Sequence, residues 1–193
     1  MKREQQILRA AEKLFYERSF DGVGVDAIGK EAGVTGSAIY RHFESKDEIL
    51  EVLFDQAIDA LLVKVGEPEG DPREELARLV NAHIGFALSH ERLAAIWSRE
   101  VRALSGTGQR NFLRRQHRYV ERWVDCLAVC YPRRSRDELV SAVRAVHGLM
   151  MSDATRPPGG KRAPQLHALL VDLALAALEV LAEPDAGRSA ATE

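Results

Sequence analysis

Apolar residues recur at helical spacing along most of the chain, and no segment alternates apolar and polar residues as a half-buried strand does. The first helical pattern covers about residues 3–18 and places five apolar side chains on one face: Ile7, Leu8, Ala11, Leu14 and Phe15. Glycine and proline interrupt the later patterns, at residues 66–70, 105–108, 132, 153–164 and 184. The spacing therefore predicts an all-α fold of about nine helices.

Three of the predicted helices begin with the same signature, a small polar residue followed three places later by glutamate. The pairs are Ser45 with Glu48, Asp71 with Glu74, and Ser135 with Glu138. The first side chain of each pair can accept a hydrogen bond from an unpaired amide of the first turn, and the glutamate can reach back. We therefore expect helices to start directly after these three residues.

The helical pattern breaks twice in the stretch AGVTGSAIYRHFESKDEIL, residues 32–50. A helix-turn-helix needs two short helices joined by a glycine-containing turn; the first braces against the DNA backbone and the second enters the major groove. We expect residues 26–32 to form the bracing helix, Gly33 the turn and residues 35–42 the reading helix, within a motif of about residues 24–43.

The predicted reading helix has one side for packing and one side that suits a DNA groove. Its apolar side consists of Ala32, Val34, Ile39 and Phe43. The candidate DNA-binding residues are Thr35, Gly36, Ser37, Tyr40, Arg41 and His42, together with Lys46 at the start of the next helix. Hydroxyl groups can bond base edges or phosphates, Gly36 permits close approach, and residues 32–43 contain no acid. Residues 1–48 carry eight Lys or Arg against nine Asp or Glu, so tight binding should need two copies.

The N-terminal helix and the stretch FDGVGVDAIGKEAGVTGSAIYRHFESKDEIL resemble the DNA-binding domain of the TetR family of bacterial transcriptional repressors. The positions of the family's pattern hold these residues in this chain: Gly22, Gly24, Ile28, Gly29, Ala32, Gly33, Val34, Tyr40, His42, Phe43, Ser45, Lys46 and Leu50. Two positions depart from the family's pattern. Gly24 lacks the usual hydroxyl, and Gly29 replaces the usual alanine, which should loosen the bracing helix by up to about 1 kcal/mol.

The resemblance implies a helix-turn-helix DNA-binding domain at residues 1–48 and a helical bundle at residues 49–183, which holds a ligand pocket and forms a homodimer through its last two helices. We expect residues 184–193 to be a disordered tail. The implied function is a homodimeric repressor that a small hydrophobic ligand releases from operator DNA. The segments IWSREVRAL and RRQHRYVERWVDCL are also similar to actinobacterial TetR-like regulators of lipid and acyl-thioester metabolism, which implies a lipid or acyl-CoA-like ligand. The alternative is a helical-bundle enzyme or small-molecule carrier using the same pocket.

The last helical pattern, residues 166–181, is apolar around most of its circumference, more than the last helix of a monomer needs. This favours a dimer, and the other interpretation is a helix in the centre of a monomer. The expected interface residues are Leu139, Val143, Val146, Leu166, Leu170, Leu173, Ala177 and Leu181.

Polar and bulky residues stand among apolar ones in the middle helices, a mixture typical both of ligand pockets and of ordinary cores. The candidate ligand-binding residues are His83, Phe86, Trp97, Glu100, Tyr119, Trp123, Met150 and Met151. The histidines lack metal-ligand spacing, and no Ser/His/Asp pattern, phosphate-binding glycine loop or carboxylate pair indicates catalysis. We therefore expect no metal, no cofactor and no enzyme activity.

Arginines recur every four residues in the segment RNFLRRQHRYVERW. This arginine ladder consists of Arg110, Arg114, Arg118 and Arg122, with Arg115 beside it. A solvated face paired with nearby acids would give such a pattern. The second interpretation is a basic rim of Arg114, Arg118 and Arg122 that holds an anionic ligand such as acyl-CoA, because guanidinium groups suit phosphates.

Composition adds little about partners, since 27 Lys and Arg nearly balance 29 Asp and Glu in 193 residues. The two cysteines, Cys126 and Cys130, exclude a disulfide framework and suit a reducing, cytoplasmic location, either as buried thiols or as a redox pair. The first residues contain no apolar run, so we expect no signal peptide there. Asp172 and Glu179 interrupt the most apolar segment, so we expect no membrane partner.

Overall fold

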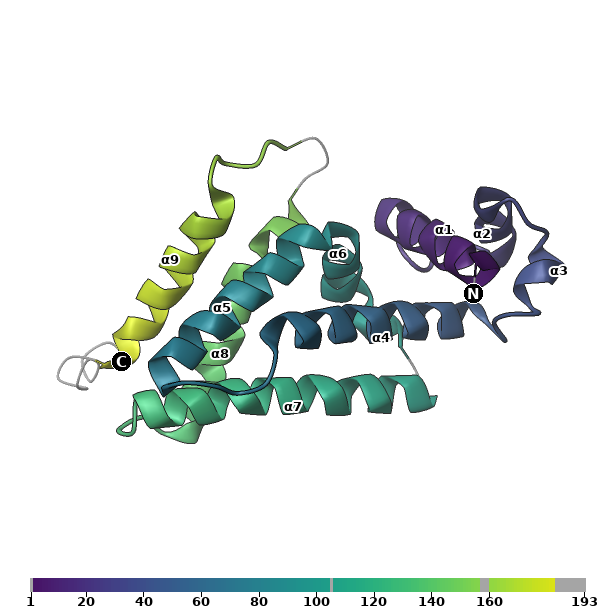
Figure 1. Cartoon of the computed structure of the whole chain (residues 1–193). Helices are drawn as coiled ribbons and strands as arrows, with labels where there is room; N and C mark the ends of the chain where they lie inside the picture. Colours follow the sequence, from purple (N-terminus) through teal and green to yellow (C-terminus); the bar gives the residue numbers. More distant parts are fainter. Residues whose placement is uncertain (1, 105, 157–159, 183–193) are drawn as a thin grey trace, which may run out of the picture.

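The computed structural model describes residues 2–104, 106–156 and 160–182, and within these residues the regular structure is entirely helical (Figure 1). The α-helices are α1 (Lys2–Arg18), α2 (Val25–Ala32), α3 (Gly36–Ile39), α4 (Lys46–Val65), α5 (Pro72–Ser89), α6 (Glu91–Glu100), α7 (Gly106–Cys130), α8 (Arg136–Met150) and α9 (Leu166–Glu179). Short 3-10 helices follow α6, α8 and α9: η1 (Val101–Ala103), η2 (Ser152–Thr155) and η3 (Val180–Ala182). The predicted all-α fold is confirmed.

α1, α2, α3 and the start of α4 lie together at one end of an elongated molecule and enclose the first of two hydrophobic cores (Figure 1). The apolar face predicted for α1 is the buried one, because Ile7, Ala11 and Phe15 are each 0% exposed. The Phe15 and Phe20 rings lie 5.2 Å apart between centroids. Burial of this stripe holds α1 against α2 and α4.

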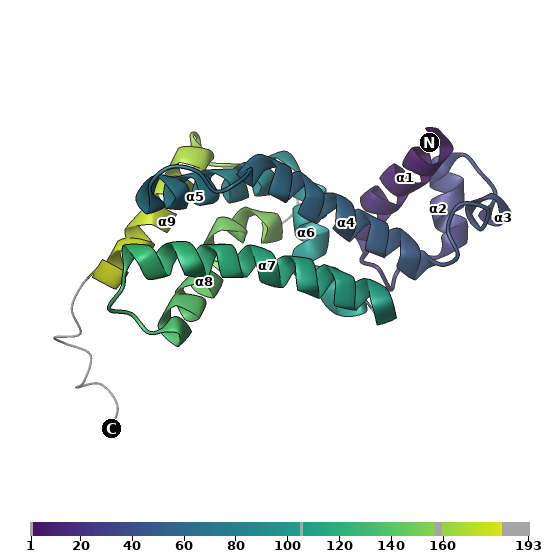
Figure 2. The same ribbon diagram turned by 60° about the horizontal axis from the view of Figure 1, so that its bottom comes forward.

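The second core lies among α5, α7, α8 and α9 and the second half of α4 (Figures 1 and 2). Trp123 of α7 is completely buried in it. α9 covers one side of α5 and α8, and its buried residues are Leu170, Ala174 and Leu178. The apolar residues of α9 therefore divide between this core and the surface.

α4 passes from the N-terminal unit into the bundle without a break, with α7 alongside it (Figure 2). Ile49 and Leu53 belong to the first core, whereas Leu61 and Val65 belong to the second. The first core also includes Phe112 from α7. The domain boundary at residue 48 remains a prediction, and it falls at the start of a helix that both cores share.

The three helix starts predicted from sequence are confirmed. Ser45 Oγ accepts from the Glu48 amide at 3.1 Å, and Asp71 Oδ1 accepts from the Arg73 amide at 2.8 Å. Ser135 forms a complete capping box, since the Ser135 amide also donates to Glu138 Oε2 at 2.8 Å. These bonds satisfy amides that the helices themselves leave unpaired.

α3 is shorter than the predicted reading helix of residues 35–42. Its α-helix ends at Ile39, and residues 40–42 continue as turns in which the Arg41 amide donates to Ala38 O at 3.4 Å and the His42 amide to Ile39 O at 2.8 Å. These bonds span three residues, so the segment tightens instead of extending the α-helix. The predicted tail at residues 184–193 lies outside the described residues. In the described part, no helix is long and apolar enough to cross a membrane.

Candidate DNA interface and ligand cavity

Glycine shapes the turn between α2 and α3. Gly33 follows α2 with φ 67° and ψ 34°, in the left-handed region that glycine enters without steric cost. The next amide, that of Val34, donates to Gly29 O at 2.9 Å. A Cβ at Gly29 would lie 3.0 Å from Val34 O, so glycine lets the turn pack directly on α2. The sequence suggested only a looser helix at Gly29, whereas the structure shows a close contact.

Thr35 and Ser37 hold the start of α3. The Ala38 amide donates to Thr35 Oγ1 at 3.2 Å, and the Thr35 and Ser37 hydroxyl oxygens lie 3.0 Å apart. Ile39 turns inward and is 1% exposed. The buried Ile39 side chain therefore fixes α3 to the N-terminal unit, and the Thr35 cap stabilises the start of the helix.

Most predicted DNA-binding side chains lie on the surface. The exposed ones are Thr35, Ser37, Tyr40, Arg41 and His42. Tyr40 is 59% exposed, although tyrosine usually buries much of its ring. Gly36 is half-buried against α2, where a Cβ would lie 2.3 Å from Asp26 Oδ1. Its small size therefore serves packing on α2, in addition to any approach to DNA.

Lys46 points back into the protein. Its Nζ donates to Phe20 O at 3.0 Å and lies 4.0 Å from the centroid of the Phe20 ring. The ammonium group is thus engaged within the N-terminal unit. This geometry disagrees with the expectation of an outward phosphate contact, because the side chain joins the start of α4 to the loop after α1.

A cavity of about 320 Å³ lies among α4, α5, α6, α7 and α8, and we call it the inner cavity. Its lining residues are Leu61, His83, Phe86, Trp97, Ser98, Val101, Gln116, His147, Gly148 and Met151. The volume falls in the lower part of the range of ligand pockets. Of the predicted ligand-binding residues, His83, Phe86, Trp97 and Met151 line it.

The other predicted ligand-binding residues lie elsewhere. Met150 is 0% exposed in the second core, and Tyr119 and Trp123 pack behind the histidines of the cavity. Glu100 Oε1 accepts a hydrogen bond from the Phe20 amide at 3.2 Å, so it faces the N-terminal unit. Helical spacing showed that these residues were inside the protein, but it did not separate the cavity wall from the packing behind it.

Four residues with polar side chains line the inner cavity: Ser98, Gln116 and two neutral histidines, His83 and His147. The His83 and His147 rings stack with centroids 4.6 Å apart, and His83 Nδ1 lies 3.0 Å from the Tyr119 hydroxyl oxygen. Burial lowers the pKa of His83 well below its ordinary value and that of His147 to about 4. The Nε2 atoms of both rings are buried without a hydrogen-bond partner. Sequence analysis missed His147 because its cavity neighbours come from other helices.

The arginine ladder does not rim the inner cavity, so that cavity does not fit the interpretation of the ladder as an anionic-ligand rim. Arg114 and Arg118 are exposed, while Arg122 is half-buried and donates to Glu75 Oε1 from Nε at 2.8 Å and from Nη2 at 2.6 Å. Glu75 is only 7% exposed, so its carboxylate needs such a partner. Arg115 pairs with Asp55 of α4 at 2.8 Å. The ladder is thus partly solvated surface and partly structural ion pairs.

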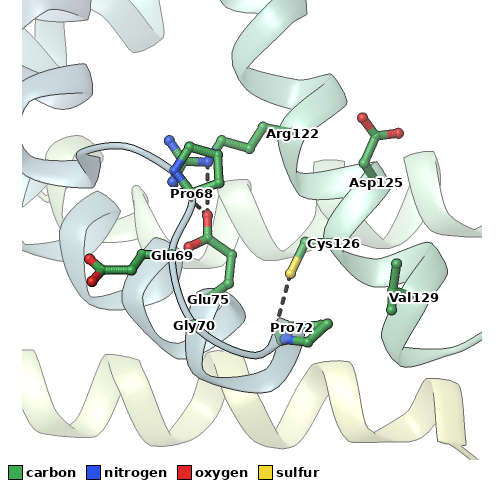
Figure 3. Close-up of a pocket in the computed structure, with 9 residues that line it drawn as sticks. All are labelled: Pro68, Glu69, Gly70, Pro72, Glu75, Arg122, Asp125, Cys126 and Val129. Atoms are coloured by element: carbon green, nitrogen blue, oxygen red, sulfur yellow. Dashed lines mark hydrogen bonds and ion pairs between the residues drawn. The ribbon is translucent and has the colours of Figure 1, made fainter.

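Arg122 and Glu75 border a second cavity of about 630 Å³ between the loop before α5 and α7 (Figure 3). In the same wall, the Cys126 thiol donates to Pro72 O at 3.1 Å. Burial raises the pKa of Cys126 to about 12 and raises that of Cys130. Both thiols are therefore protonated at neutral pH, which favours plain thiols over a redox pair.

α6 connects the inner cavity to the N-terminal unit. Trp97 and Ser98 line the cavity, and the next two residues hold the end of α1. Arg99 Nη2 donates to Tyr16 O at 2.9 Å, and Glu100 accepts from the Phe20 amide. A displacement of α6 would therefore act directly on α1 and on the loop that follows it.

The α9 surface differs from the predicted dimer interface. Leu139, Val143, Val146 and Leu170 are at most 5% exposed and belong to the chain's own core. Leu166 and Leu181 are half-buried, and Ala177 is exposed. The exposed large apolar residues of the α9 region are Leu169 (46%), Leu173 (47%) and Val180 (43%). An uncovered apolar face is thus present on α9, but much of the predicted interface packs inside the protomer.

Comparison with known proteins identifies the class of protein. The family model described as "Bacterial regulatory proteins, tetR family" matches residues 7–53. The model described as "Tetracyclin repressor-like, C-terminal domain" matches residues 69–178, more than half of the chain. The chain therefore belongs to the TetR family of bacterial regulatory proteins, whose members are transcription regulators, and the enzyme alternative has no support.

Individual relatives agree with this assignment. The fatty acid metabolism regulator protein of Bacillus subtilis is 28% identical over 100 residues, which cover 50% of this chain and 52% of that relative. The transcriptional repressor KstR2 of Mycobacterium tuberculosis is 25% identical over 129 residues, 65% of this chain and 64% of the relative. These alignments thus span between about half and two thirds of the relatives' own length.

Solved structures share the fold. The structure of KstR2, a ketosteroid transcriptional regulator, superposes with a TM-score of 0.77 at 23% identity, covering 92% of this chain and 94% of that one. AibR in complex with isovaleryl coenzyme A and operator DNA gives a TM-score of 0.76 at 17% identity, covering 92% and 97% of the two chains. The same helical arrangement therefore extends over nearly the whole chain.

Proposed function

We propose that this TetR family regulator is a homodimeric repressor that binds operator DNA through α3 and is released by a small, mostly apolar ligand in the inner cavity. Such a protein acts where the bacterial DNA is, so we place it in the cytoplasm. The observation that carries the proposal is the continuity of α6, which lines the cavity at Trp97, holds α1 through Arg99 and holds the loop after α1 through Glu100.

DNA recognition would use the exposed polar side of α3 and the turn after it. Thr35 and Ser37 can bond phosphates or base edges, and Tyr40 can present its ring to a thymine methyl group. Arg41 and His42 would add contacts from the end of the segment, and Arg41 supplies a full positive charge. Because the N-terminal unit carries no excess of positive charge, useful affinity requires two copies on one operator.

The second copy would dock on the exposed face of α9. Leu169, Leu173 and Val180 leave apolar surface uncovered on one side of this helix, and such a continuous face is typical of an interaction site. A symmetric pair would present its two α3 helices to successive major grooves, about 34–36 Å apart. Any ligand that favours a different separation lowers operator affinity by its preference for that state.

The ligand would be a lipid-like or acyl-thioester compound. Phe86, Trp97 and Val101 give the inner cavity an apolar wall, and its polar atoms are few. Relatives and fold neighbours include regulators named for fatty acids and ketosteroids, and AibR was solved with isovaleryl coenzyme A. In this chain, the arginine ladder lies outside the inner cavity, so it would not hold the phosphates of such a ligand.

A mobility-shift experiment tests the proposal. The full-length chain is titrated onto duplex DNA from upstream of its own gene, in parallel with an unrelated duplex at the same salt concentration. We expect preferential binding to the upstream duplex as a two-protomer complex, and release by a subset of acyl-CoA and steroid compounds. Equal binding to both duplexes would contradict the assignment of an operator-binding regulator.

A further inference from the structure

A groove of about 550 Å³ lies between α7 and α8, and we call it the outer groove. Gln116 of α7 and His147 of α8 line both this groove and the inner cavity. The same pair of side chains therefore stands between the two spaces. The outer groove also has an apolar lining, which consists of Leu113, Val120, Val140 and Val143.

The two side chains of this partition are held differently. The His147 ring packs against the rings of His83 and Trp123, with centroids 4.6 and 4.9 Å away. The Gln116 side chain is half-buried, and its amide makes no hydrogen bond with any other described residue. A change of the Gln116 rotamer therefore breaks no hydrogen bond within this part of the protein, whereas His147 is fixed by packing.

The two spaces also differ in charge. None of the described residues that line the inner cavity is an acid, a lysine or an arginine, and burial lowers the pKa values of its two histidines, so they are neutral. An anionic group would be buried there without a countercharge, which is costly. The inner cavity therefore suits the apolar part of a ligand.

The outer groove, in contrast, offers a positive charge. Arg144 lines it, is exposed, and has no ion-pair partner among the described residues. Glu121, the acid among the described lining residues, is already paired with Arg136 and lies 3.8 Å from His117 Nε2. An anionic group therefore fits the outer groove beside Arg144.

We infer that the inner cavity and the outer groove form one elongated site for a single-chain acyl compound, with the chain in the inner cavity, the Gln116 side chain moved aside and the anionic end at Arg144. This inference rests on the proposed ligand-responsive function and adds the second half of the site and the orientation of the ligand. The volume of the inner cavity alone is at the lower end of the range of ligand pockets, and the joined spaces lie well within that range.

Chain length tests whether the ligand passes Gln116. Octanoate, decanoate, dodecanoate and tetradecanoate are titrated onto the full-length protein without DNA, and the fluorescence of Trp97 in the cavity wall reports occupancy. Affinity should rise along the whole series, by up to about fourfold for each further buried methylene group. Gln116→Phe places a rigid ring in the partition, so affinity should stop rising at a shorter chain. Gln116→Ala is the matched opposite change and should retain the full rise.

The anionic end is tested at Arg144. Arg144→Gln should lower dodecanoate affinity roughly threefold to fivefold, as expected for a partly exposed charge pair, and leave the affinity of methyl dodecanoate unchanged. Arg133→Gln, at an exposed arginine before α8, is the matched control and should bind both probes normally. Dodecanoyl-CoA in the same assay distinguishes a carboxylate from phosphates, since only a compound whose anion reaches Arg144 loses affinity. Circular dichroism and sedimentation velocity verify the fold and the oligomeric state of each variant.

Any one of three results overturns the inference, even if the chain binds its operator. These are no binding of any acyl compound, the same chain-length dependence in Gln116→Phe and the unaltered protein, and normal affinity of Arg144→Gln for both dodecanoate and dodecanoyl-CoA. If Gln116→Phe binds no probe, the Arg144→Gln comparison decides alone. An altered oligomeric state of Arg144→Gln with normal ligand affinity would assign the groove to a contact between copies and also overturns the inference. A chain-length limit set by residue 116 together with an anion effect at Arg144 supports it, even if the protein shows no sequence-specific DNA binding.

Discussion

Lys46 and Phe20 are joined in two ways, since Lys46 Nζ donates to the Phe20 carbonyl oxygen at 3.0 Å and lies 4.0 Å from the Phe20 ring centroid. The same residue, Phe20, donates its amide hydrogen to Glu100 of α6. The loop after α1 thus connects the start of α4 with the end of α6. Lys46 is therefore expected to act on DNA affinity through the position of this loop.

Salt dependence distinguishes this role from a phosphate contact. Lys46→Ala should weaken operator binding without changing the slope of log affinity against log salt concentration, because its ammonium group is engaged inside the protein. Arg41→Ala, an exposed matched control, should flatten the slope by about one unit. Fluorescence anisotropy titrations at several salt concentrations measure both. If Lys46→Ala changed the slope as much as Arg41→Ala, Lys46 would be shown to contact a DNA phosphate.

The exposed face of α9 predicts a dimer that two substitutions should separate. Leu169→Glu with Leu173→Glu places two carboxylates where the proposed partner docks, and the desolvation cost should give a folded monomer. Val63→Glu, on the 82% exposed Val63 of α4, is the control and should remain dimeric. Sedimentation velocity measures the oligomeric state of each variant. A stable dimer of the Leu169→Glu/Leu173→Glu protein would show that the interface lies elsewhere.

Filling the inner cavity should block ligands without loosening the fold. Gly148 lines the cavity, and a Cβ at this position would meet no atom within 4 Å. Gly148→Leu should therefore abolish the binding of small apolar ligands to the inner cavity. Replacement of a helical glycine should also stabilise the helix by up to about 1 kcal/mol. Gly148→Ala is the matched smaller change and should retain binding. Fluorescence titration and urea unfolding measure the two effects, and ligand binding by Gly148→Leu comparable to wild type would exclude this site.

The arginine ladder should divide into silent and structural positions. Arg114→Gln with Arg118→Gln should change the free energy of unfolding by no more than about 0.5 kcal/mol, as exposed substitutions usually do. Arg122→Gln should cost on the order of 2 kcal/mol, below the usual loss for a broken buried pair, because Arg78 still contacts Glu75. Urea unfolding compares the variants. A silent Arg122→Gln would mean that Glu75 is adequately solvated without it.

Acid should destabilise the protein through the cavity histidines. The pKa of His147 is lowered to about 4 in the folded state, so the unfolded chain, with a histidine pKa near its ordinary 6.5, binds the proton more readily below pH 6.5. The stability from the neutral ring is complete above that pH and is lost as the pH falls toward 4. Between pH 7.5 and pH 5, the loss from this residue alone should be about 2 kcal/mol. In urea unfolding at both pH values, His147→Phe should show a smaller dependence, and an unchanged dependence would contradict this assignment.

Local signals in the sequence predicted the elements well, because their causes are local. The spacing of Ile7 and Phe15 gave the buried face of α1, and Ser135 with Glu138 gave the start of α8. The same applies to the turn at Gly33, which requires a left-handed residue. The surface position of α3 followed from the same reasoning.

Contacts between residues far apart in the sequence could not be predicted from these local signals. Gln116, His147 and Gly148 form a cavity wall only after α7 and α8 pack against α5. The partner of Arg122 is Glu75, 47 residues earlier, so the ladder could not be divided into paired and free positions from its spacing. For the same reason, the periodicity of α9 gave an apolar helix but not the side that its own core covers.

The sharing of α4 between both cores limits how this regulator can be rebuilt. An N-terminal unit truncated after residue 53 would lose its contacts with Phe54, Ile96 and Phe112, all of which belong to the first core. A hybrid that transfers only the N-terminal segment onto another ligand domain would therefore need a recipient whose α6 and α7 supply equivalent apolar side chains. The N-terminal unit would carry its own DNA specificity in such a hybrid, but its hydrophobic core is complete only with side chains from the bundle.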